Sequence, residues 1–246
     1  MPETIFSVQL FATCLVDAIR PAAGLATLRL LERLGVKVIV PSGQTCCGQP
    51  AFNSGCLADA RAMARYTIDL LEKSPVPIVV PSGSCGDMIV HRYRDLLADD
   101  PAYASKAERV AARTYELSQY LSDVLKVQDV GAQCRRTITY HPSCHLLRGL
   151  GVRSAPSQLL DSIADARCVS LPGAEDCCGF GGTFAVKMGE LSSAMLNRKL
   201  DAIVESGADT VVACDAGCLM HIEGGLKRRG SNVAVRHLAE VLVESE

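Results

Sequence analysis

The sequence of 246 residues lacks an apolar run long enough to cross a lipid bilayer. Its best hydrophobic stretches, Val36–Val40 and Ile78–Val80, are far too short. The N-terminus also lacks the basic segment of a secretory signal peptide, so we expect a cytoplasmic protein without a membrane span. Neither sign of charge is in excess, and a net charge of −2 argues against nucleic acid as a partner.

Familiar catalytic patterns are missing as well. We find no Ser-His-Asp order, no paired carboxylates and no P-loop, so nothing supports a hydrolase or a kinase. The glycines of Cys178–Thr183 have the wrong spacing for a dinucleotide-binding turn. Hydrophobic residues make up 48% of the chain and charged residues 21%, which indicates a globular fold rather than disorder.

Cysteine, in contrast, is abundant, with 12 residues. Eight of them form two copies of one pattern: a single cysteine, a Cys-Cys-Gly run and a last cysteine. The copies are Cys14, Cys46-Cys47-Gly48 and Cys85, then Cys144, Cys177-Cys178-Gly179 and Cys218. Disulfide frameworks suit small secreted chains, so in a cytoplasmic chain of this size the two quartets predict metal or redox sites. Deprotonated cysteine is the preferred protein ligand of zinc and of iron–sulfur clusters.

Short β-branched runs alternate with helical patterns along the whole chain. This alternation predicts an α/β fold, in which parallel sheets are flanked by helices. We expect strands at Ile5–Phe11, Val36–Val40, Ile78–Val80, Thr137–Tyr140, Arg167–Leu171, Val211–Ala213 and Val233–Val235. We expect helices at Gly24–Leu34, Leu57–Glu72, Asp87–Leu97, Ala107–Leu125, Ser157–Ala164, Gly189–Ser206, Leu219–Arg228 and His237–Val243.

The repeat extends beyond the cysteines. Tyr115–Leu121 resembles Arg236–Leu242, and each segment follows the last cysteine of its copy. The polar stretch Lys126–Arg136 separates the copies, which predicts two pseudo-symmetric lobes that face each other, residues 1–126 and 137–246. Each quartet cysteine follows a predicted strand. Because the loops at the carboxyl ends of parallel strands form a common crevice, we expect the metal-binding loops to meet there.

The repeated Cys-Cys-Gly pattern is similar to that of the cysteine-rich (Cys-Cys-Gly) domain family of iron–sulfur proteins. This family includes the cysteine-rich component of heterodisulfide reductase and the iron–sulfur component of glycolate oxidase. The resemblance covers essentially the whole chain and is greatest to the lactate-utilisation protein A branch. The stretches that support this branch are Pro81–Cys85, Tyr140–Arg148 and Gly217–Met220.

The resemblance implies an electron-transfer subunit of an oxidoreductase complex that oxidises L-lactate to pyruvate. It implies one iron–sulfur cluster per lobe, 4Fe-4S in preference to 2Fe-2S, with zinc as an alternative in one lobe. The implied partners are the other lactate-utilisation subunits, including a ferredoxin-like iron–sulfur protein. The predicted cofactor and metal ligands are Cys14, Cys46, Cys47, Cys85, Cys144, Cys177, Cys178 and Cys218. A thiol–disulfide reductase like heterodisulfide reductase and a zinc-binding structural module are the alternatives, and no catalytic residue is assigned.

The sequence departs from the family pattern at one position in each copy. The family has Cys-x-x-Cys where this chain has Ser82 and Asp215 before the last cysteine of each copy. Cys214, one position away, is either a fifth ligand or a buried thiol. Three further cysteines have no counterpart in the other copy and are interpreted as small buried hydrophobes: Cys56, Cys134 and Cys168.

Two basic residues near Cys144 have open interpretations. His145 either donates a hydrogen bond to a cluster sulfide, relays a proton, or satisfies a backbone carbonyl. Arg148 either offsets the charge of a thiolate-ligated cluster or lies on a solvated face.

Overall fold

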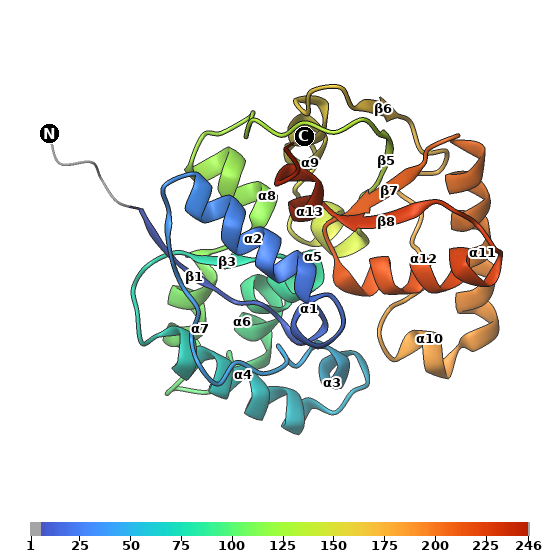
Figure 1. Ribbon diagram of the computed structural model, residues 1–246. Coiled ribbons are helices and arrows are strands. Elements are labelled where there is room, and N and C mark those ends of the chain that lie inside the picture. Colours follow the sequence, from blue (N-terminus) through green and yellow to red (C-terminus); the bar gives the residue numbers. More distant parts are fainter. Residues whose placement is uncertain (1–5, 246) are drawn as a thin grey trace, which may run out of the picture.

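The computed structural model describes residues 6–245 and consists of two lobes, each built on a parallel four-stranded sheet (Figure 1). The strand order is β2-β1-β3-β4 in the first sheet and β6-β5-β7-β8 in the second. Helices cover both sheets, which confirms the predicted α/β class. The two sheets have the same order because the second half of the chain repeats the path of the first.

Each strand is short, and most are followed by a helix. The first half contains β1 (Ser7–Leu10), α1 (Cys14–Ile19), α2 (Pro21–Arg33), β2 (Lys37–Ile39), α3 (Gln49–Asn53), α4 (Leu57–Leu71), β3 (Ile78–Val80), α5 (Gly83–Asp87), η1 (Met88–Arg92), α6 (Tyr93–Leu96), α7 (Ala104–Ala111), β4 (Thr114–Glu116), α8 (Leu117–Gln119) and η2 (Tyr120–Val124). The second contains β5 (Thr137–His141), η3 (His145–Gly149), α9 (Ala155–Asp161), β6 (Arg167–Val169), α10 (Phe184–Lys187), α11 (Gly189–Glu205), β7 (Thr210–Ala213), α12 (Ala216–Arg228), β8 (Ala234–His237) and α13 (Leu238–Leu242).

The strand register shows which positions of the two lobes correspond. Leu10 pairs with Val79 in the first sheet, and Tyr140 pairs with Val212 in the second. In each lobe the chain leaves the central strand on one side and returns on the other, so the strand order reverses between β1 and β3 and between β5 and β7. Ligands of open α/β sheets bind at the carboxyl ends of strands at such a reversal.

One predicted helix is wrong. The pattern in Ala107–Leu125 predicts a single helix, but α7 ends at Ala111 and β4 pairs with β3 before a new helix begins. A strand of three residues is too short to show its own periodicity between two helical segments. The Thr114 hydroxyl donates to the Val110 carbonyl (2.7 Å) and covers the end of α7.

Smaller differences concern the ends of elements. The first strand runs from Ser7 to Leu10, and the predicted start at Ile5 lies outside the described residues. Helix α12 begins at Ala216 instead of Leu219, so Cys218 lies in the first turn of a helix. Cys14 and Cys85 likewise lie in first turns, of α1 and α5. These three cysteines therefore lie in helices, whereas both Cys-Cys pairs lie in loops as predicted.

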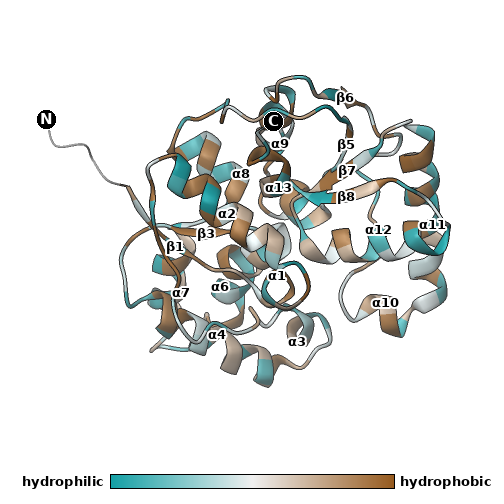
Figure 2. Ribbon diagram, in the orientation of Figure 1, coloured by the Kyte–Doolittle hydropathy of each residue, from teal (hydrophilic) through white to brown (hydrophobic). Residues whose placement is uncertain are grey.

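The two lobes share a hydrophobic core. One buried cluster contains Leu30 and Leu121 from the first half together with Leu146 and Leu238 from the second. Helix α13, which is strongly hydrophobic, packs against α2 (Figure 2). A Cβ atom on Gly83 would lie 2.7 Å from the Leu146 Cβ, so α5 and η3 approach as closely as glycine allows. Because the core is shared, the predicted division into residues 1–126 and 137–246 stays a prediction.

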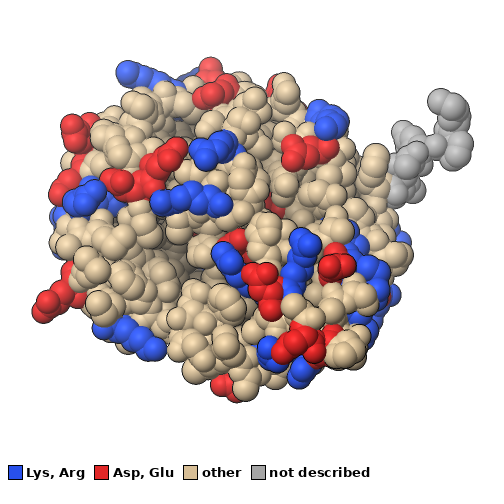
Figure 3. Space-filling model, turned by 180° about the vertical axis from the view of Figure 1, so that it is seen from behind, with Lys and Arg blue, Asp and Glu red and all other residues tan. Residues whose placement is uncertain are grey.

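Charged side chains of both signs are interspersed on the face seen in Figure 3. Ion pairs also form at the surface, for example between Arg109 and Glu72 (2.7 Å). Exposed pairs of this kind contribute little to stability. No helix within residues 6–245 is long and apolar enough to span a membrane.

Candidate metal centre

The cysteine quartets of both lobes line one cavity of about 400 Å³. The cavity lies where the carboxyl ends of the strands of the two lobes face each other. The structure thus brings together all eight residues that the sequence singles out: Cys14, Cys46, Cys47, Cys85, Cys144, Cys177, Cys178 and Cys218. Their role as ligands stays a prediction, but the convergence on which it depends is present.

Each quartet forms a chain of neighbouring thiols. None of the 12 cysteines is in a disulfide, and the Cys47 thiol donates to Cys85 with 3.3 Å between the sulfurs. Cys14 and Cys47 both donate to Cys46 and lower its pKa. The Gly48 N–H also donates to the Cys46 sulfur (3.5 Å). The second lobe repeats this order in Cys144, Cys177, Cys178 and Cys218.

The pKa of Cys177 is lowered in the same way, by its thiol neighbours Cys144 and Cys178 and by the Gly179 N–H (3.3 Å). Each quartet thus stabilises a thiolate at the first cysteine of its Cys-Cys pair. The thiolate is the form that binds metal.

The glycine after each cysteine pair is required by the backbone. Gly48 has φ +87° and Gly179 has φ +88°, in the left-handed region that favours glycine. A Cβ on Gly179 would lie 2.6 Å from the Ser192 carbonyl oxygen of α11. A Cβ on Gly48 would lie 3.2 Å from the Met63 Cβ of α4. The tight turn holds both thiols at the cavity while α4 in the first lobe, or α11 in the second, packs close behind.

Ser82 and Asp215, which replace the family's additional cysteines, join the two lobes instead. Ser82 accepts a hydrogen bond from the Cys85 N–H (3.4 Å), and Asp215 accepts one from the Cys218 N–H (3.3 Å). The two caps also meet, because Ser82 Oγ donates to Asp215 Oδ2 (3.0 Å). The Ser84 N–H donates to the same oxygen (2.9 Å). These bonds fix α5 and α12, and so the last cysteine of each quartet, relative to each other.

Two buried hydroxyls at the cavity have no hydrogen-bond partner among the described residues. Thr13 Oγ1 and Ser143 Oγ precede Cys14 and Cys144, and both residues line the cavity. Thr13 also has φ +71°, a strained conformation for a residue with a side chain. An unpaired buried hydroxyl is costly, and strain concentrates at functional sites. Sulfide or thiolate acceptors would satisfy both hydroxyls, so the residues present fit an iron–sulfur cluster or a thiolate-bound metal in each lobe.

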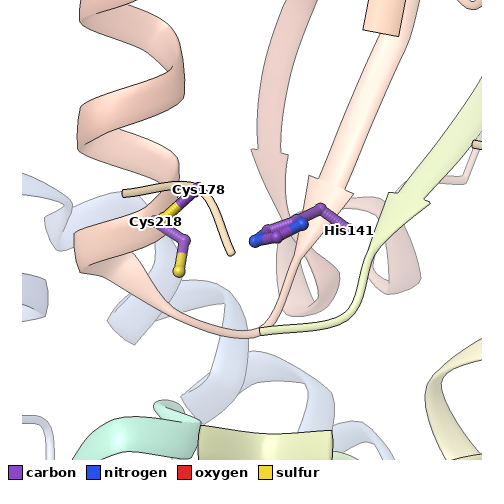
Figure 4. Close-up of side chains that lie close together, drawn as sticks. All are labelled: His141, Cys178 and Cys218. Carbon is purple, nitrogen blue, oxygen red and sulfur yellow. The ribbon is translucent and has the colours of Figure 1, made fainter. Parts of the chain in front are cut away.

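Two histidines approach the second quartet from different sides. His145 lines the cavity, and its Nδ1 lies 2.7 Å from Asp87 Oδ2 of the first lobe, whose hydrogen bond raises the pKa of His145. The interpretation of His145 as a carbonyl partner is therefore wrong. His141 is buried, and neither ring nitrogen has a hydrogen-bond partner of normal geometry among the described residues. A ring nitrogen and the sulfurs of Cys178 and Cys218 all lie within 4.8 Å of one another (Figure 4).

Other candidates lie away from the cavity. Cys214 belongs to the shared core and lies 3.7 Å from the Tyr140 hydroxyl, which supports the interpretation as a buried thiol. Arg148 is exposed and donates to the Glu175 carbonyl (3.1 Å), so it does not offset charge at the thiols.

The remaining cysteines divide by exposure. Cys134 is buried as expected, but Cys56 and Cys168 are exposed, so the buried interpretation is wrong for these two. Cys168 is on β6, an edge strand of the second sheet, and Cys56 precedes α4. An edge strand and a helix start leave room for a solvent-exposed thiol.

The sequence interpretation missed Thr13 and Ser143. A signal was present, since a hydroxyl residue directly precedes the first cysteine in both copies. Comparison of the two copies position by position, rather than cysteine by cysteine, would have found it.

The site and the fold define a class of protein. The family model of the cysteine-rich (CCG) domain matches the chain twice, at residues 8–90 and 138–223, so the chain belongs to the cysteine-rich domain family. Within it, the chain is 47% identical to Lactate utilization protein A of Bacillus cytotoxicus and 48% identical to that of a Geobacillus species. It is 47% identical to Lactate utilization protein A of Bacillus subtilis. Each alignment covers 96% of this chain and 98% of the relative.

A solved structure supports the fold alone. A hypothetical protein from Helicobacter pylori superposes with a TM-score of 0.63 at 12% sequence identity. The alignment covers 98% of this chain but 49% of the other, so this chain spans about half the length of that protein.

Proposed function

We propose that the chain is an electron-transfer subunit with two iron–sulfur centres, one held by each cysteine quartet, in a complex that oxidises L-lactate to pyruvate. The single observation that carries this proposal is the cavity between the lobes, which is lined by two equivalent sets of four thiols. The lactate substrate rests on the relatives named Lactate utilization protein A. Four thiolates per lobe suit a 4Fe-4S centre, which we prefer to 2Fe-2S.

In this proposal the residues of the chain bind each iron–sulfur centre, fix its position and shield it from water. Each centre would supply one-electron redox chemistry, and the two would match the two electrons that leave a 2-hydroxy acid on oxidation. Cys47 and Cys178 are buried, which keeps water from the inner thiols. The hydrogen bond between Ser82 and Asp215 holds the last cysteines of both quartets in fixed relation. A short and constant separation between centres favours electron transfer from one to the other.

In this proposal, another subunit of the complex oxidises lactate, and this chain transfers the electrons. We propose the other lactate-utilisation subunits as partners, including a ferredoxin-like iron–sulfur protein, and the cytoplasm as the location. A thiol–disulfide reductase is less well supported, because Ser82 and Asp215 stand in for the extra cysteines and Cys214 lies in the core. Zinc in the second lobe is the second candidate, because nitrogen and sulfur donors meet at His141, Cys178 and Cys218.

Metal analysis of protein purified without oxygen tests the proposal. We expect brown protein with iron and acid-labile sulfide in both lobes and a paramagnetic signal on reduction. Colourless protein that carries zinc and no sulfide would refute the iron–sulfur function and leave the zinc module. Four irons and one zinc per chain would restrict the redox function to one lobe.

Cys46→Ser tests whether the quartets are independent. Cys46 has two thiol neighbours in its quartet, so its loss should remove about half of the bound iron, as should Cys177→Ser. Cys56→Ser is the matched control, because Cys56 is exposed and outside the cavity, and it should keep all the iron. Loss of all the iron in Cys46→Ser would show a single shared centre instead.

A further inference from the structure

The two quartets have different surroundings at equivalent positions. Leu10 and Tyr140 occupy the same place in the two sheets, so the next residues, Phe11 and His141, correspond. Both side chains are buried. The first lobe thus presents an apolar ring where the second presents an imidazole close to Cys178 and Cys218. Neither nitrogen of this imidazole has a hydrogen-bond partner of normal geometry among the described residues.

A second pair shows the same contrast. Gly48 packs against Met63 of α4, and Gly179 packs against Met195 of α11, which fixes the correspondence of these helices. One turn further along, Thr67 in the first lobe matches Lys199 in the second. Both are buried, with 1% and 2% of their surface exposed.

Lys199 is held in place behind the second quartet. Its Nζ donates to the carbonyls of Gly173 (2.7 Å) and Ala174 (3.1 Å). Burial lowers the pKa of Lys199, while Asp176 and the sulfurs of the second quartet act in the opposite direction. The sulfurs of the second quartet therefore favour the ammonium form of Lys199, while burial opposes it.

Near Thr67, the first lobe has the neutral hydroxyl of Tyr93. The Tyr93 hydroxyl donates to the Cys47 carbonyl (2.7 Å), and burial raises the pKa of Tyr93. In the second lobe, His141 acts to lower the pKa of Cys177, and Lys199 acts to lower that of Cys218. In the first lobe, the pKa values of Cys46 and Cys47 are shifted by neighbouring thiols, by burial and, for Cys46, by the Gly48 N–H.

Two carboxylates oppose the cation of the second lobe, and the exposed one, Asp176, pairs with Arg198 (3.1 Å). Asp215 accepts from the Gly217 and Cys218 N–H groups, so its negative charge lies beside the second quartet. This charge raises the pKa of Cys144 and Cys218. The other oxygen of Asp215 accepts from Ser82 and Ser84 of the first lobe, so donors on both oxygens offset part of the charge.

We propose that the centre held by Cys144, Cys177, Cys178 and Cys218 has the higher reduction potential, so that electrons pass from the first lobe to the second. Reduction adds negative charge, which a buried cation and a polar imidazole beside the sulfurs stabilise better than the apolar ring of Phe11 does. In the step, one electron leaves the reduced first centre and enters the oxidised second centre, and no proton is transferred. This inference rests on the proposed function, in which oxidation of a 2-hydroxy acid supplies the electrons.

A mediated redox titration of the whole chain, followed by electron paramagnetic resonance, tests which centre has the higher reduction potential. We expect two reduction steps. Cys177→Ser should abolish the step at higher potential and Cys46→Ser the step at lower potential. The opposite assignment, a single common potential, or a cluster in one lobe only would overturn the inference and leave iron–sulfur binding intact. Absence of iron and sulfide from both lobes would instead refute the proposed function.

Exchange of residues between the lobes tests whether Lys199 and His141 cause the difference in reduction potential. Lys199→Thr and His141→Phe give the second lobe the residues of the first, and each should lower the higher potential toward the lower one. Thr67→Val is the matched control at the equivalent position and should leave the second step unchanged. If the exchanged variants keep both clusters and the second potential does not fall, these residues do not set the order. If they do not fold, the assignment from the cysteine variants still decides the order.

Discussion

The two lobes repeat the same thiols, glycines and strand order, but they differ at the seam where they meet. Ser82 in the first lobe corresponds to Asp215 in the second, and the two side chains hydrogen-bond to each other. Gly83, which donates its N–H to the Cys214 carbonyl (3.1 Å), corresponds to Ala216. Two identical carboxylates across the seam would both be hydrogen-bond acceptors. Two different residues, such as Ser82 and Asp215, can supply one donor and one acceptor. The repeated positions therefore line the cavity, and the unequal positions hold the lobes together.

The largest effect is expected at the seam. Asp215→Ala would leave buried donors on both sides without an acceptor, among them the hydroxyl of Ser82 and the N–H of Ser84. We expect a loss of about 4 kcal/mol in the free energy of unfolding, measured by urea denaturation of the metal-free chain. Ser82→Ala removes one donor and one weak cap, and should cost about 1 kcal/mol.

The difference between the two variants is the informative quantity. Equal losses would show that the seam is symmetric and that Asp215 has no special role. Asp215→Asn serves as a conservative control, because it keeps an oxygen acceptor, and it should fall between the wild-type chain and Asp215→Ala.

A smaller effect is expected at the Cys-Cys-Gly turns. Gly179→Ala forces a Cβ into the left-handed conformation and to 2.6 Å from a backbone oxygen, so we expect a loss of about 3 kcal/mol. Gly48→Ala meets its nearest atom at 3.2 Å and should cost about 1–2 kcal/mol. Thermal unfolding of the metal-free variants measures both losses. A larger loss for Gly48→Ala would contradict the tighter packing of α11.

Much of this architecture can be predicted from the sequence. Local patterns and spacing predict the parallel strands, which the β-branched runs form. They also predict the internal repeat and the convergence of eight cysteines. These features depend on short-range preferences or on topology, which the order of residues expresses directly.

Features that depend on contacts between distant segments could not be predicted in this way. Strand β4 is three residues long, and it forms because β3 offers a free edge. The bonds of Asp215 to Ser82 and of His145 to Asp87 join different lobes, and no local pattern encodes them. The repeat did hold a clue to β4, because the segment that resembles Tyr115–Leu121 begins with the last two residues of β8.

The last contrast between the lobes is a pair of helix caps of opposite acid–base character. Glu116 ends β4 and accepts from the Ser118 N–H (2.7 Å), while His237 ends β8 and accepts from the Ala239 N–H (3.1 Å). Both side chains are fully buried. Because Nδ1 of His237 is an acceptor, its Nε2 carries the proton and donates to the Pro81 carbonyl of the first lobe (3.1 Å). Glu116 Oε1 has no partner among the described residues.

These caps should give stability profiles of opposite slope. Burial raises the pKa of Glu116 to about 7 and lowers the pKa of His237 to about 4. Unfolding therefore releases a proton from Glu116 above the ordinary carboxyl pKa, and its contribution to stability should fall by about 2 kcal/mol between about pH 5 and pH 7. His237 must take up a proton on unfolding below the ordinary imidazole pKa, so its contribution should fall by about 2 kcal/mol between about pH 6 and pH 4.

Urea denaturation of Glu116→Gln and His237→Gln across pH 4 to 8 separates the two contributions, since each variant removes one titrating group and keeps an amide of similar size. Relative to the wild-type chain, Glu116→Gln should gain stability as the pH rises toward 7, and His237→Gln should gain stability as the pH falls toward 4. Parallel profiles for both variants and the wild-type chain would mean that neither cap keeps its uncharged form in the folded protein. The seam would then tolerate a buried charge on either side, and the difference between the lobes would be one of shape alone.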